Sequence, residues 1–488
     1  MSTYSSSDKS VAVKLFVSIY LISLFFFKPD MQFARFVFLT KAIAHHQTTA
    51  IDQVEQDSGL SVVDKFSRDG RGYISPTPGL SVLALISYLP YSQIVLSGSD
   101  YITKLAPEAE FKLSQFIMTL STVTFFTALT VSLFYLWLRR LDVQWKRALF
   151  FSLLLYGGTP LVFYSLNITN GQNVLEMGLL FLAFFLLQQA DPPSGANVWL
   201  SGMCVGLSIF CNITAGFLLG LFLFYLFDYK SIGVRLLWLS GLTVGGLSLI
   251  VYNLMSFGNL LPSYNNLLFE AGVTRPHFSD IWVVFWVFVS SPRIGLIFFS
   301  PVVLMGLHSA AHQPRTKIST IRIQLAVFTY LILVSYATAV LNIRHGFGDG
   351  WYAVMGGGGP RYLLPVLPYL VGLVAVRDFK TGWQTTLTVA LCSISLLINL
   401  PGLFWTGGQA WFLNNLLLFL KNGVHSYMLE EFRALFLYMS LNVSRMSIYP
   451  SAALLAVFLW WLWKGNVLVG DLFSRVGSSR HAQETPDV

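Results

Sequence analysis

The sequence predicts an all-α protein that crosses a membrane many times. Of its 488 residues, 55% are hydrophobic and only 11% are charged, whereas ordinary soluble domains carry roughly 25% charged residues. The mean hydropathy is +0.63, and the apolar residues occur in unbroken runs, unlike the alternating strands of an outer-membrane barrel. We therefore expect one integral membrane domain over residues 1–488, built as a bundle of transmembrane helices.

The apolar runs divide into about twelve spans. The first, Val11 to Phe27, follows Lys9 and Lys14 and has no small-residue cleavage site. It is therefore expected to be an uncleaved helix whose N-terminus lies in the cytoplasm. The other spans are expected at 113–138, 148–165, 174–190, 198–211, 214–228, 234–253, 283–307, 323–342, 362–376, 382–401 and 450–464. The pair 198–211 and 214–228 is short for two crossings, and one long tilted helix is the alternative.

The distribution of Lys and Arg predicts the orientation in a plasma membrane. With this span count the cationic loops, such as Arg139 to Arg147, lie in the cytoplasm, as the positive-inside rule requires. If the apolar stretch Leu80 to Leu96 also crossed, that cluster would lie outside. We therefore expect Leu80 to Leu96 to be an interfacial or re-entrant helix and both chain termini to be cytoplasmic.

The polar, Gly- and Pro-rich segments fall on the outer side, so any chemistry is expected there. They comprise a first outer loop with interfacial helices at 28–112 and an outer or interfacial segment at 402–449, while 465–488 is expected to be a cytoplasmic tail. The 31 Lys and Arg residues are scattered, which argues against nucleic-acid binding. The three cysteines lie in apolar runs and the histidines lack ligand spacing, so no metal site is predicted.

Asp30 is the leading candidate for a reactive group. It follows Lys28-Pro29 at the expected exit of the first helix, where burial and nearby cations can tune a carboxylate. The plainer interpretation is a solvated charge at the interface. Asp52, Asp69 and Tyr73 are further candidates for ligand contacts in the same loop.

Arg361 is the leading candidate for binding phosphate. Four glycines at 356–359 allow backbone to approach a ligand closely, and a guanidinium offers a two-donor fork to an oxyanion. The alternative is a flexible connector that ends in a snorkelling arginine. Arg293 and Glu176 lie in or near apolar runs, where an ionisable residue is costly unless it is paired or faces a cavity. The remaining candidate contacts are Tyr264, Asp349, Trp351 and Tyr362.

Three segments match the acceptor pattern for N-glycosylation, which also arises easily by chance. They are Asn167-Ile168-Thr169, Asn212-Ile213-Thr214 and Asn442-Val443-Ser444.

Taken together and in this order, these motifs resemble the GT-C class of membrane glycosyltransferases. More narrowly, the sequence is similar to the bacterial branch related to protein O-mannosyltransferases and lipid A aminoarabinose transferases. The residues that carry the resemblance are Asp30, Tyr73 with Pro78-Gly79-Leu80, Asn253 with Phe257-Gly258, Ser291-Pro292-Arg293 with Gly295, and Gly359-Pro360-Arg361-Tyr362-Leu363 with Pro365 and Pro368.

The resemblance implies a polyprenyl-phosphate-linked sugar donor, an active site that faces outward, and a first-loop aspartate that acts as base. Met31 and Thr77 depart from the pattern: relatives often have a second acidic residue at the first position and a lysine at the second. No cofactor is predicted; a requirement for a divalent metal and the oligomeric state are left open. The expected partners are membrane lipids and the lipid-linked sugar.

The function that fits best is inverting transfer of a sugar to a lipid, glycan or protein acceptor on the outer face. Asp30 would deprotonate the acceptor, and Arg361, with Arg293 as second choice, would bind the donor phosphate. The alternatives are a transporter or a flippase for lipid-linked sugars, or a non-catalytic assembly protein of the same fold. Transporters often contain internal repeats around a midplane site, and this sequence has no convincing repeat.

Overall fold

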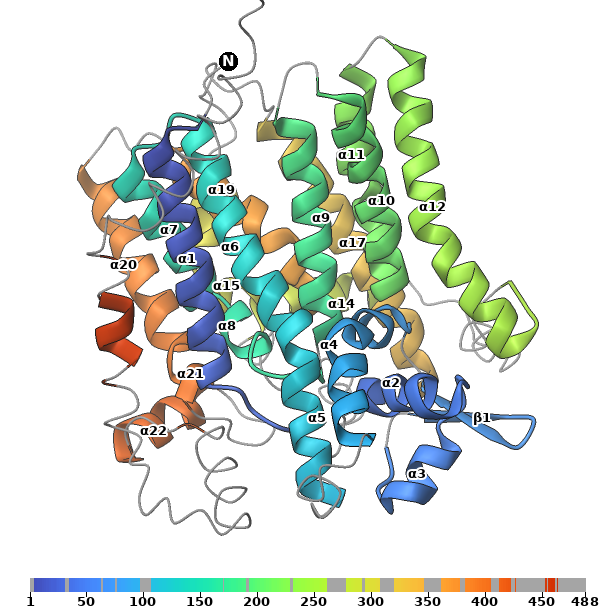
Figure 1. The fold of residues 1–488 in the computed structure, drawn as a ribbon. Coiled ribbons are helices and arrows are strands. Elements are labelled where there is room, and N and C mark those ends of the chain that lie inside the picture. Colours follow the sequence, from blue (N-terminus) through green and yellow to red (C-terminus); the bar gives the residue numbers. More distant parts are fainter. Residues whose placement is uncertain are drawn as a thin grey trace, which may run out of the picture.

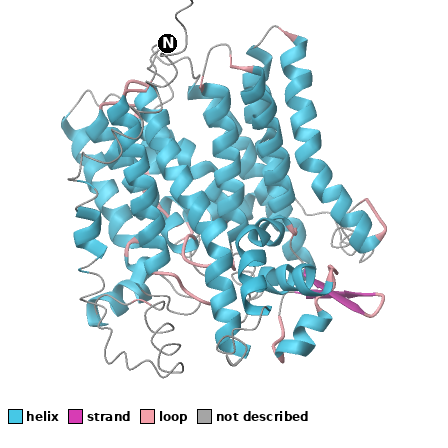
Figure 2. Ribbon diagram, viewed as in Figure 1, coloured by secondary structure: helices cyan, strands magenta, loops and turns pink. Residues whose placement is uncertain are grey.

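The structure, a computed structural model, describes most of the chain and confirms the expected all-α membrane class. The described residues are 4–30, 35–62, 65–74, 77–96, 107–169, 171–189, 193–228, 231–260, 278–291, 295–307, 320–345, 361–377, 382–404, 412–422, 426, 453, 455–460 and 463. They are mostly helical, and strands β1 (Lys65–Arg68) and β2 (Arg71–Ile74) form the one sheet among them (Figure 2).

Five of the described helical segments are long and apolar enough to cross a membrane. They are Pro107–Arg140, Gly171–Gln188, Ile232–Phe257, Ile321–Ala339 and Gly382–Phe404. The bundle seen in Figure 1 contains α1 (Ser6–Phe25), α5 (Pro107–Ser121), α6 (Val123–Arg140), α7 (Trp145–Gly157), α9 (Gly171–Gln188), α10 (Gly195–Cys211), α11 (Leu219–Asp228), α12 (Ile232–Phe257), α17 (Thr320–His345) and α20 (Gly382–Asn399). Of the expected span 450–464 the structure describes 453, 455–460 and 463, all helical, and the tail 465–488 lies outside the described residues.

Several expected spans are interrupted helices, and proline lies at or beside most of the interruptions. Residues 148–165 form α7 and the short α8 (Leu161–Tyr164), with Pro160 just before the second piece. The 283–307 span divides into α14 (Phe278–Ser290), α15 (Leu296–Phe299) and α16 (Val303–Leu307), and Pro301 precedes the last piece. The 362–376 span begins as the 3-10 helix η2 (Arg361–Val366) and continues as α19 (Leu367–Ala375). Proline favours such breaks because it donates no backbone hydrogen bond.

The segment 198–228 forms two separate passes, which removes the single-helix alternative. α10 ends at Cys211, and Asn212 is extended, with φ −157° and ψ 123°. The 3-10 helix η1 (Ile213–Leu218) and α11 follow. α10 and α12 then run parallel to each other, because Gly202 faces Trp238 to Leu242 and Gly206 faces Leu242 to Gly246. Two parallel neighbours require the intervening chain to return across the bundle.

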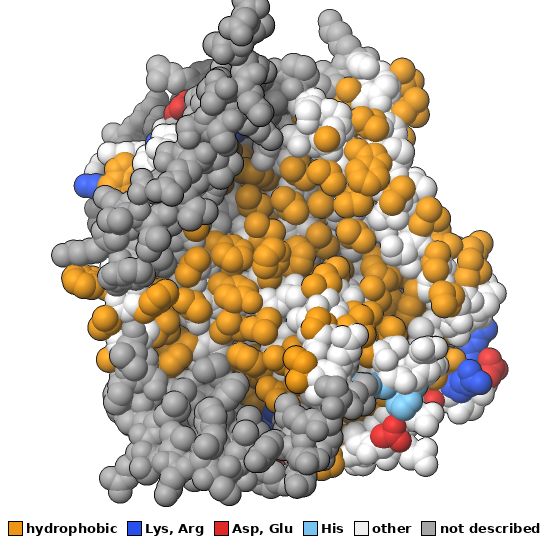
Figure 3. Space-filling model, viewed as in Figure 1, with side chains coloured by type: hydrophobic (Ala, Val, Ile, Leu, Met, Phe, Trp, Pro, Cys, Tyr) orange, Lys and Arg blue, Asp and Glu red, His pale blue; other side chains and the backbone are white. Residues whose placement is uncertain are grey.

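Glycine makes the α10–α12 contact possible. A Cβ atom added to Gly202, Gly206, Gly241 or Gly245 would lie under 3.0 Å from backbone atoms of the other helix. Small residues spaced four apart are the usual means by which helices in a membrane bring their backbones together. The outer side of α12 is by contrast largely exposed and apolar. It forms part of the broad band of hydrophobic side chains across the middle of the molecule (Figure 3).

The first loop forms a cap at one end of the bundle, at the bottom of Figure 1. It contains α2 (Arg35–His46), α3 (Asp52–Ser58), the β1–β2 hairpin and α4 (Gly79–Leu96). The helix expected over 80–96 is thus present as α4, which packs against α2 and α5. The hairpin was not predicted. Figure 3 shows a group of charged and histidine side chains at this end, below the apolar band, and other charged side chains near the opposite end.

Polar contacts between side chains join α2 to α4 and α5. Lys41 forms an ion pair with Glu110 on α5, and His45 Nε2 lies 2.7 Å from the Tyr88 hydroxyl on α4. Burial, assisted by the charge of Lys41, lowers the pKa of His45. The ring is therefore neutral at pH 7, and the contact with Tyr88 is a hydrogen bond between uncharged groups.

At the opposite end of the bundle, several arginines donate hydrogen bonds to backbone carbonyls, most of them at or near helix C-termini. Arg139 donates to Val143 O at 2.6 Å, Arg377 to Met305 O at 3.0 Å, Arg235 to Leu226 O and Arg322 to Phe224 O at 3.4 Å each, and Arg147 to Val374 O and Arg377 O. A cation is favourable there because the carbonyls at a helix C-terminus have no partner within the helix and carry partial negative charge.

The predicted orientation can be tested by cysteine labelling. Ser67 on β1 and Ser231 just before α12 are both exposed and lie at opposite ends of the molecule (Figure 1). The three native cysteines are buried, so their background labelling is expected to be low. An impermeant thiol reagent added to intact cells should label Ser67→Cys and leave Ser231→Cys unlabelled until the membrane is opened. The reverse pattern would contradict the orientation.

Candidate functional site

Asp30 lies at the end of a short segment without regular structure that follows α1, and not directly at a helix end as the sequence had suggested. α1 ends at Phe25, and Phe26 is its C-cap. The Phe26 and Phe27 rings are buried against Phe404 and Phe116, with ring centroids 5.2 Å and 5.4 Å apart. The segment from Phe26 to Asp30 is therefore fixed by its side chains instead of by the helix.

Lys28 is the next anchor of this segment. Its backbone N–H donates to Leu166 O at 2.8 Å, and its ammonium group donates to Gly402 O at 2.5 Å. The side chain is buried, with the ammonium 6.0 Å from the centre of the Phe163 ring. Burial lowers the pKa of Lys28 well below its ordinary value. Lys28 thus ties the segment to the chain between α8 and α9 and to α21 (Pro401–Phe404).

Asp30 itself is held by hydrogen bonds on both its backbone and its side chain. Its N–H donates to Gln115 Oε1 at 2.9 Å, and Gln115 Nε2 donates back to Asp30 O at 2.8 Å. The Thr169 hydroxyl donates to Asp30 Oδ2 at 3.0 Å. Gln115 and Thr169 are buried, whereas Asp30 is half-buried. A carboxylate oriented in this way can accept a proton or bind a donor at a defined place.

Arg361 begins η2, on the other side of the α8–α9 connection. Its Nη2 lies 3.2 Å from the Tyr362 hydroxyl, and its guanidinium carbon lies 4.9 Å from the centre of the Tyr362 ring. The Tyr164 hydroxyl on α8 adjoins the backbone of Arg361, and η2 packs against α9. Lys28, Asp30 and Arg361 therefore all border the connection from Leu161 to Asn173.

Three amide side chains in and beside this connection are buried with an unused oxygen. Asn167, Gln172 and Asn173 are 8%, 7% and 0% exposed, and among the described residues the amide oxygen of each has no hydrogen-bond partner. Gln172 and Asn173 belong to the first turn of α9. Buried polar atoms are nearly always paired, so the polar lining next to Asp30 has unused capacity to accept hydrogen bonds.

A second carboxyl group, Glu176, lies one turn further into α9 and is fully buried. Asn212 Nδ2 donates to its Oε2 at 2.6 Å, and the Thr214 hydroxyl lies 3.0 Å and 3.2 Å from its two oxygens. The Tyr330 hydroxyl, on α17, lies 3.5 Å from Oε1 and donates to Tyr362 O at 2.6 Å. Glu176 therefore connects α9, η1 and α17 to the residue that follows Arg361.

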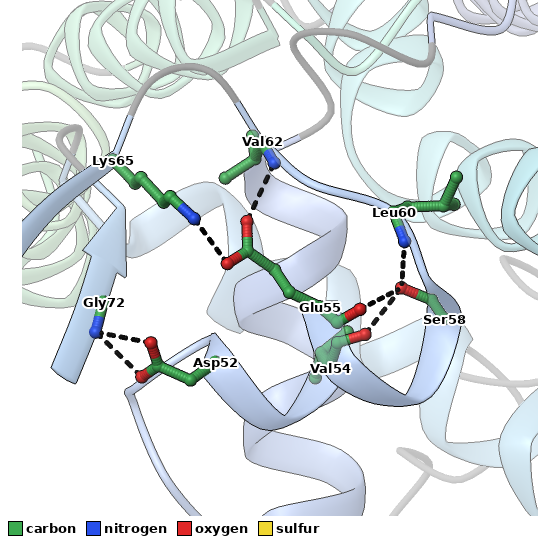
Figure 4. Close-up of polar contacts among 8 residues, drawn as sticks. All are labelled: Asp52, Val54, Glu55, Ser58, Leu60, Val62, Lys65 and Gly72. Carbon is green, nitrogen blue, oxygen red and sulfur yellow. Dashed lines mark hydrogen bonds and ion pairs between the residues drawn. The ribbon is translucent and has the colours of Figure 1, made fainter.

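The three remaining described candidates in the first loop lie in and around the β1–β2 hairpin. Asp52 accepts from the Gly72 N–H with both oxygens, at 2.9 Å and 2.8 Å, and so joins α3 to β2 (Figure 4). Asp69 occupies the hairpin turn with φ 52° and is exposed. Tyr73 is buried between Phe66 and Phe257, with ring centroids 5.8 Å and 5.0 Å away. These contacts stabilise the hairpin and its packing against the end of α12.

Thr77 and Gly79 also have a structural role. The Thr77 hydroxyl donates to Cys211 O at 2.5 Å, at the end of α10. A Cβ atom on Gly79 would lie 2.6 Å from the Cys211 backbone nitrogen. The threonine that departs from the resembled pattern therefore holds the start of α4 against α10. Arg293, Tyr264, Asp349, Trp351 and Met31 lie outside the described residues.

The polar partners of both carboxyl groups were not identified from the sequence. Thr169 and the pair Asn212 and Thr214 belong to two Asn-Ile-Thr segments that match the glycosylation pattern, yet they are buried and bind Asp30 and Glu176. The recurrence of the same three residues at the ends of two apolar runs was the only sign of them in the sequence. Among the described residues, no group of three or more His, Cys, Asp or Glu side chains is placed to hold a metal ion.

No family model and no curated protein matches the chain. Two solved structures are similar in fold. ArnT from Cupriavidus metallidurans bound to undecaprenyl phosphate is 13% identical, with a TM-score of 0.48 over 94% of this chain and 76% of that chain. ArnT from Cupriavidus metallidurans in the apo state is 14% identical, with a TM-score of 0.47 over 93% of this chain and 74% of that chain.

Proposed function

We propose that this protein transfers a sugar from a polyprenyl-phosphate donor to an acceptor hydroxyl at the end of the bundle that carries the first loop. Asp30 removes the acceptor proton, and Arg361 binds the phosphate that leaves with the lipid. Inversion at the sugar carbon follows from direct attack by the acceptor opposite the departing phosphate. The acceptor can be a lipid, a glycan or a protein.

The observation that carries the proposal is that Asp30 is held in place by two hydrogen bonds on its backbone and one on its carboxylate. A solvated interfacial aspartate would need none of the three hydrogen bonds that Gln115 and Thr169 make to it. A general base must be held within hydrogen-bonding reach of the proton that it removes, and such a base contributes typically 10²–10⁴-fold to the rate. The half-buried setting of Asp30 leaves part of its surface accessible to an acceptor.

Arg361 supports the same proposal through its position. It stands where η2 begins, beside α9 and at the same end of the bundle as Asp30. A guanidinium presents two parallel donors to a phosphate, and that geometry suits an anion whose charge increases as the sugar leaves. The apolar helices around the site would accommodate the polyprenyl chain.

The proposal is tested by transfer of a radiolabelled sugar from polyprenyl phosphate in membranes of cells that lack the protein. Restoring the protein should restore transfer to an endogenous or added acceptor. If the wild type transfers none of the donors supplied, uptake of labelled lipid-linked sugar into sealed vesicles becomes the informative measurement. Uptake without transfer would support the transporter or flippase alternative, and neither activity would support an assembly role.

Replacing Arg361 by Lys should weaken use of the donor while leaving the fold intact. Lysine keeps the positive charge and loses the planar two-donor fork, so we expect the donor KM to rise about tenfold with a smaller change in kcat. Arg71→Lys, at an exposed position on β2, is the matched control. If Arg361→Lys used the donor as the wild type does, phosphate binding would have to be assigned to another residue, Arg293 first.

A further inference from the structure

Glu176 is surrounded by neutral groups. Its hydrogen-bond partners within the described part of the chain are Asn173, Asn212, Thr214 and Tyr330, and none of these side chains carries a charge at neutral pH. The side chain is fully buried in α9, one of the helices long enough to span the membrane. An ionised carboxylate in such surroundings is costly because none of these partners is a cation that would offset the loss of hydration.

Counting protons in the network gives the same result independently. The Tyr330 hydroxyl has one proton, and its short contact of 2.6 Å is to Tyr362 O, a carbonyl that can only accept. The proton of Tyr330 therefore lies toward Tyr362. The Tyr330 oxygen then faces Glu176 Oε1 at 3.5 Å. An acid proton on Oε1 would lie between these two oxygens, whereas an ionised carboxylate would leave two acceptors facing each other.

We propose that Glu176 is a neutral carboxylic acid that positions the Arg361–Tyr362 turn through Tyr330. The acid proton on Oε1 points to the Tyr330 oxygen, and the Tyr330 proton points to Tyr362 O. Asn212 donates to the other oxygen of Glu176, and Thr214 holds the carboxyl group from η1. Each donor in this series of hydrogen bonds then has an acceptor, which is the condition for a favourable buried polar network.

Glu176 does not contact the reacting groups directly. It acts on one of them, Arg361, through Tyr330 and Tyr362. Tyr362 O belongs to the residue after Arg361, and the Tyr362 ring and hydroxyl contact the Arg361 guanidinium. A fixed Tyr362 carbonyl therefore holds the start of η2 in place, and with it the backbone from which the Arg361 side chain extends. This consequence for Arg361 rests on the proposed function, whereas the protonation of Glu176 does not.

The protonation of Glu176 is tested on purified protein without any activity assay. The infrared spectrum of the wild type at neutral pH should contain the carbonyl stretch of a protonated carboxylic acid, and this band should be missing in Glu176→Gln. The matched control is Asp69→Asn, which removes an exposed carboxylate and should leave the band unchanged. A wild-type spectrum that equals that of Glu176→Gln in this region would overturn the proposal.

The positioning role is tested by comparing three variants in the transfer assay. Glu176→Gln keeps a neutral side chain of the same shape with one donor and one acceptor, so kcat and the donor KM should stay within about threefold of wild type. Tyr330→Phe keeps the ring and removes the link to Tyr362, and should raise the donor KM about tenfold with little change in kcat, as Arg361→Lys does. Combining Tyr330→Phe with Arg361→Lys should add little to either single change, because both act on the same contact.

Two outcomes would overturn the positioning role. One is loss of transfer in a correctly folded Glu176→Gln, which would mean that the reaction needs an ionised or proton-exchanging carboxyl group at this position. The other is a donor KM for Tyr330→Phe equal to that of the wild type. Both outcomes require an active wild type, so they cannot be confused with failure of the proposed transfer reaction.

Discussion

Asp30→Asn should lower sugar transfer by roughly 10²–10⁴-fold, the usual contribution of a positioned general base, while the protein still folds and inserts. The asparagine side chain has the same shape and keeps an oxygen that can accept from Thr169, so the bonds around residue 30 can persist. It cannot accept a proton from the acceptor hydroxyl. The loss should therefore appear in kcat, with the donor KM little changed, measured as initial rates of transfer in membranes of matched protein content.

Asp69→Asn and Asp52→Asn are the controls from the same loop. Asp69 is exposed at the hairpin turn, where asparagine also tolerates a positive φ, so transfer should be unchanged. Asp52→Asn keeps an acceptor for the Gly72 N–H and should cost little activity. Near-normal turnover by Asp30→Asn together with a collapse in Asp52→Asn would move the active site to the region between α3 and the hairpin.

Gly245→Leu should prevent stable assembly of the bundle. The new side chain would have to occupy space taken by the backbone of Met203 and Leu207 on α10. The two backbones cannot move apart at this point without separating along the whole contact. We therefore expect the free energy of unfolding to fall by about 3 kcal/mol or more, at or beyond the upper end for overpacking. In detergent extracts this should appear as a small or absent monodisperse peak in size-exclusion chromatography and a lowered thermal transition.

Gly246→Leu is the control one residue away. A Cβ atom at Gly246 meets nothing within 4 Å, so the same substitution on the same helix should leave yield and thermal stability near wild type. Equal tolerance of both substitutions would mean that the close approach of α10 and α12 does not stabilise the bundle. Equal damage by both would point to an effect on insertion instead of packing.

The helical class and most element positions could be predicted because they depend on local hydrophobicity. Runs of apolar residues are visible in the sequence alone, and the expected helix at 80–96 agrees with α4 to within a residue. The two passes in 198–228 could not be separated with certainty from a single tilted helix. What separates them is the parallel contact of α10 with α12, and this depends on residues that are distant in the sequence.

The candidate site was predictable only in part. Asp30 was selected for its expected place at a helix end, but the helix ends at Phe25, and the contacts that hold Asp30 come from Gln115 and Thr169. Glu176 could be recognised as unusual because an acidic residue stood in an apolar run, yet its partners come from η1 and α17. Sequence spacing carries no information about such tertiary neighbours. The hairpin was missed because its strands have four residues each.

The arginines at the end of the bundle opposite the first loop have a consequence for biogenesis. Cationic residues beside spans bias each helix toward one orientation as it enters the membrane. Here the same guanidiniums later donate to carbonyls of helices that are distant in the chain, as Arg322 of α17 does to Phe224 O and Arg147 of α7 to Val374 O. A span inserted upside down would carry its guanidinium to the opposite leaflet and leave those carbonyls unmatched. These hydrogen bonds can therefore form only when each span has the orientation that insertion first selected, so the completed fold favours that topology.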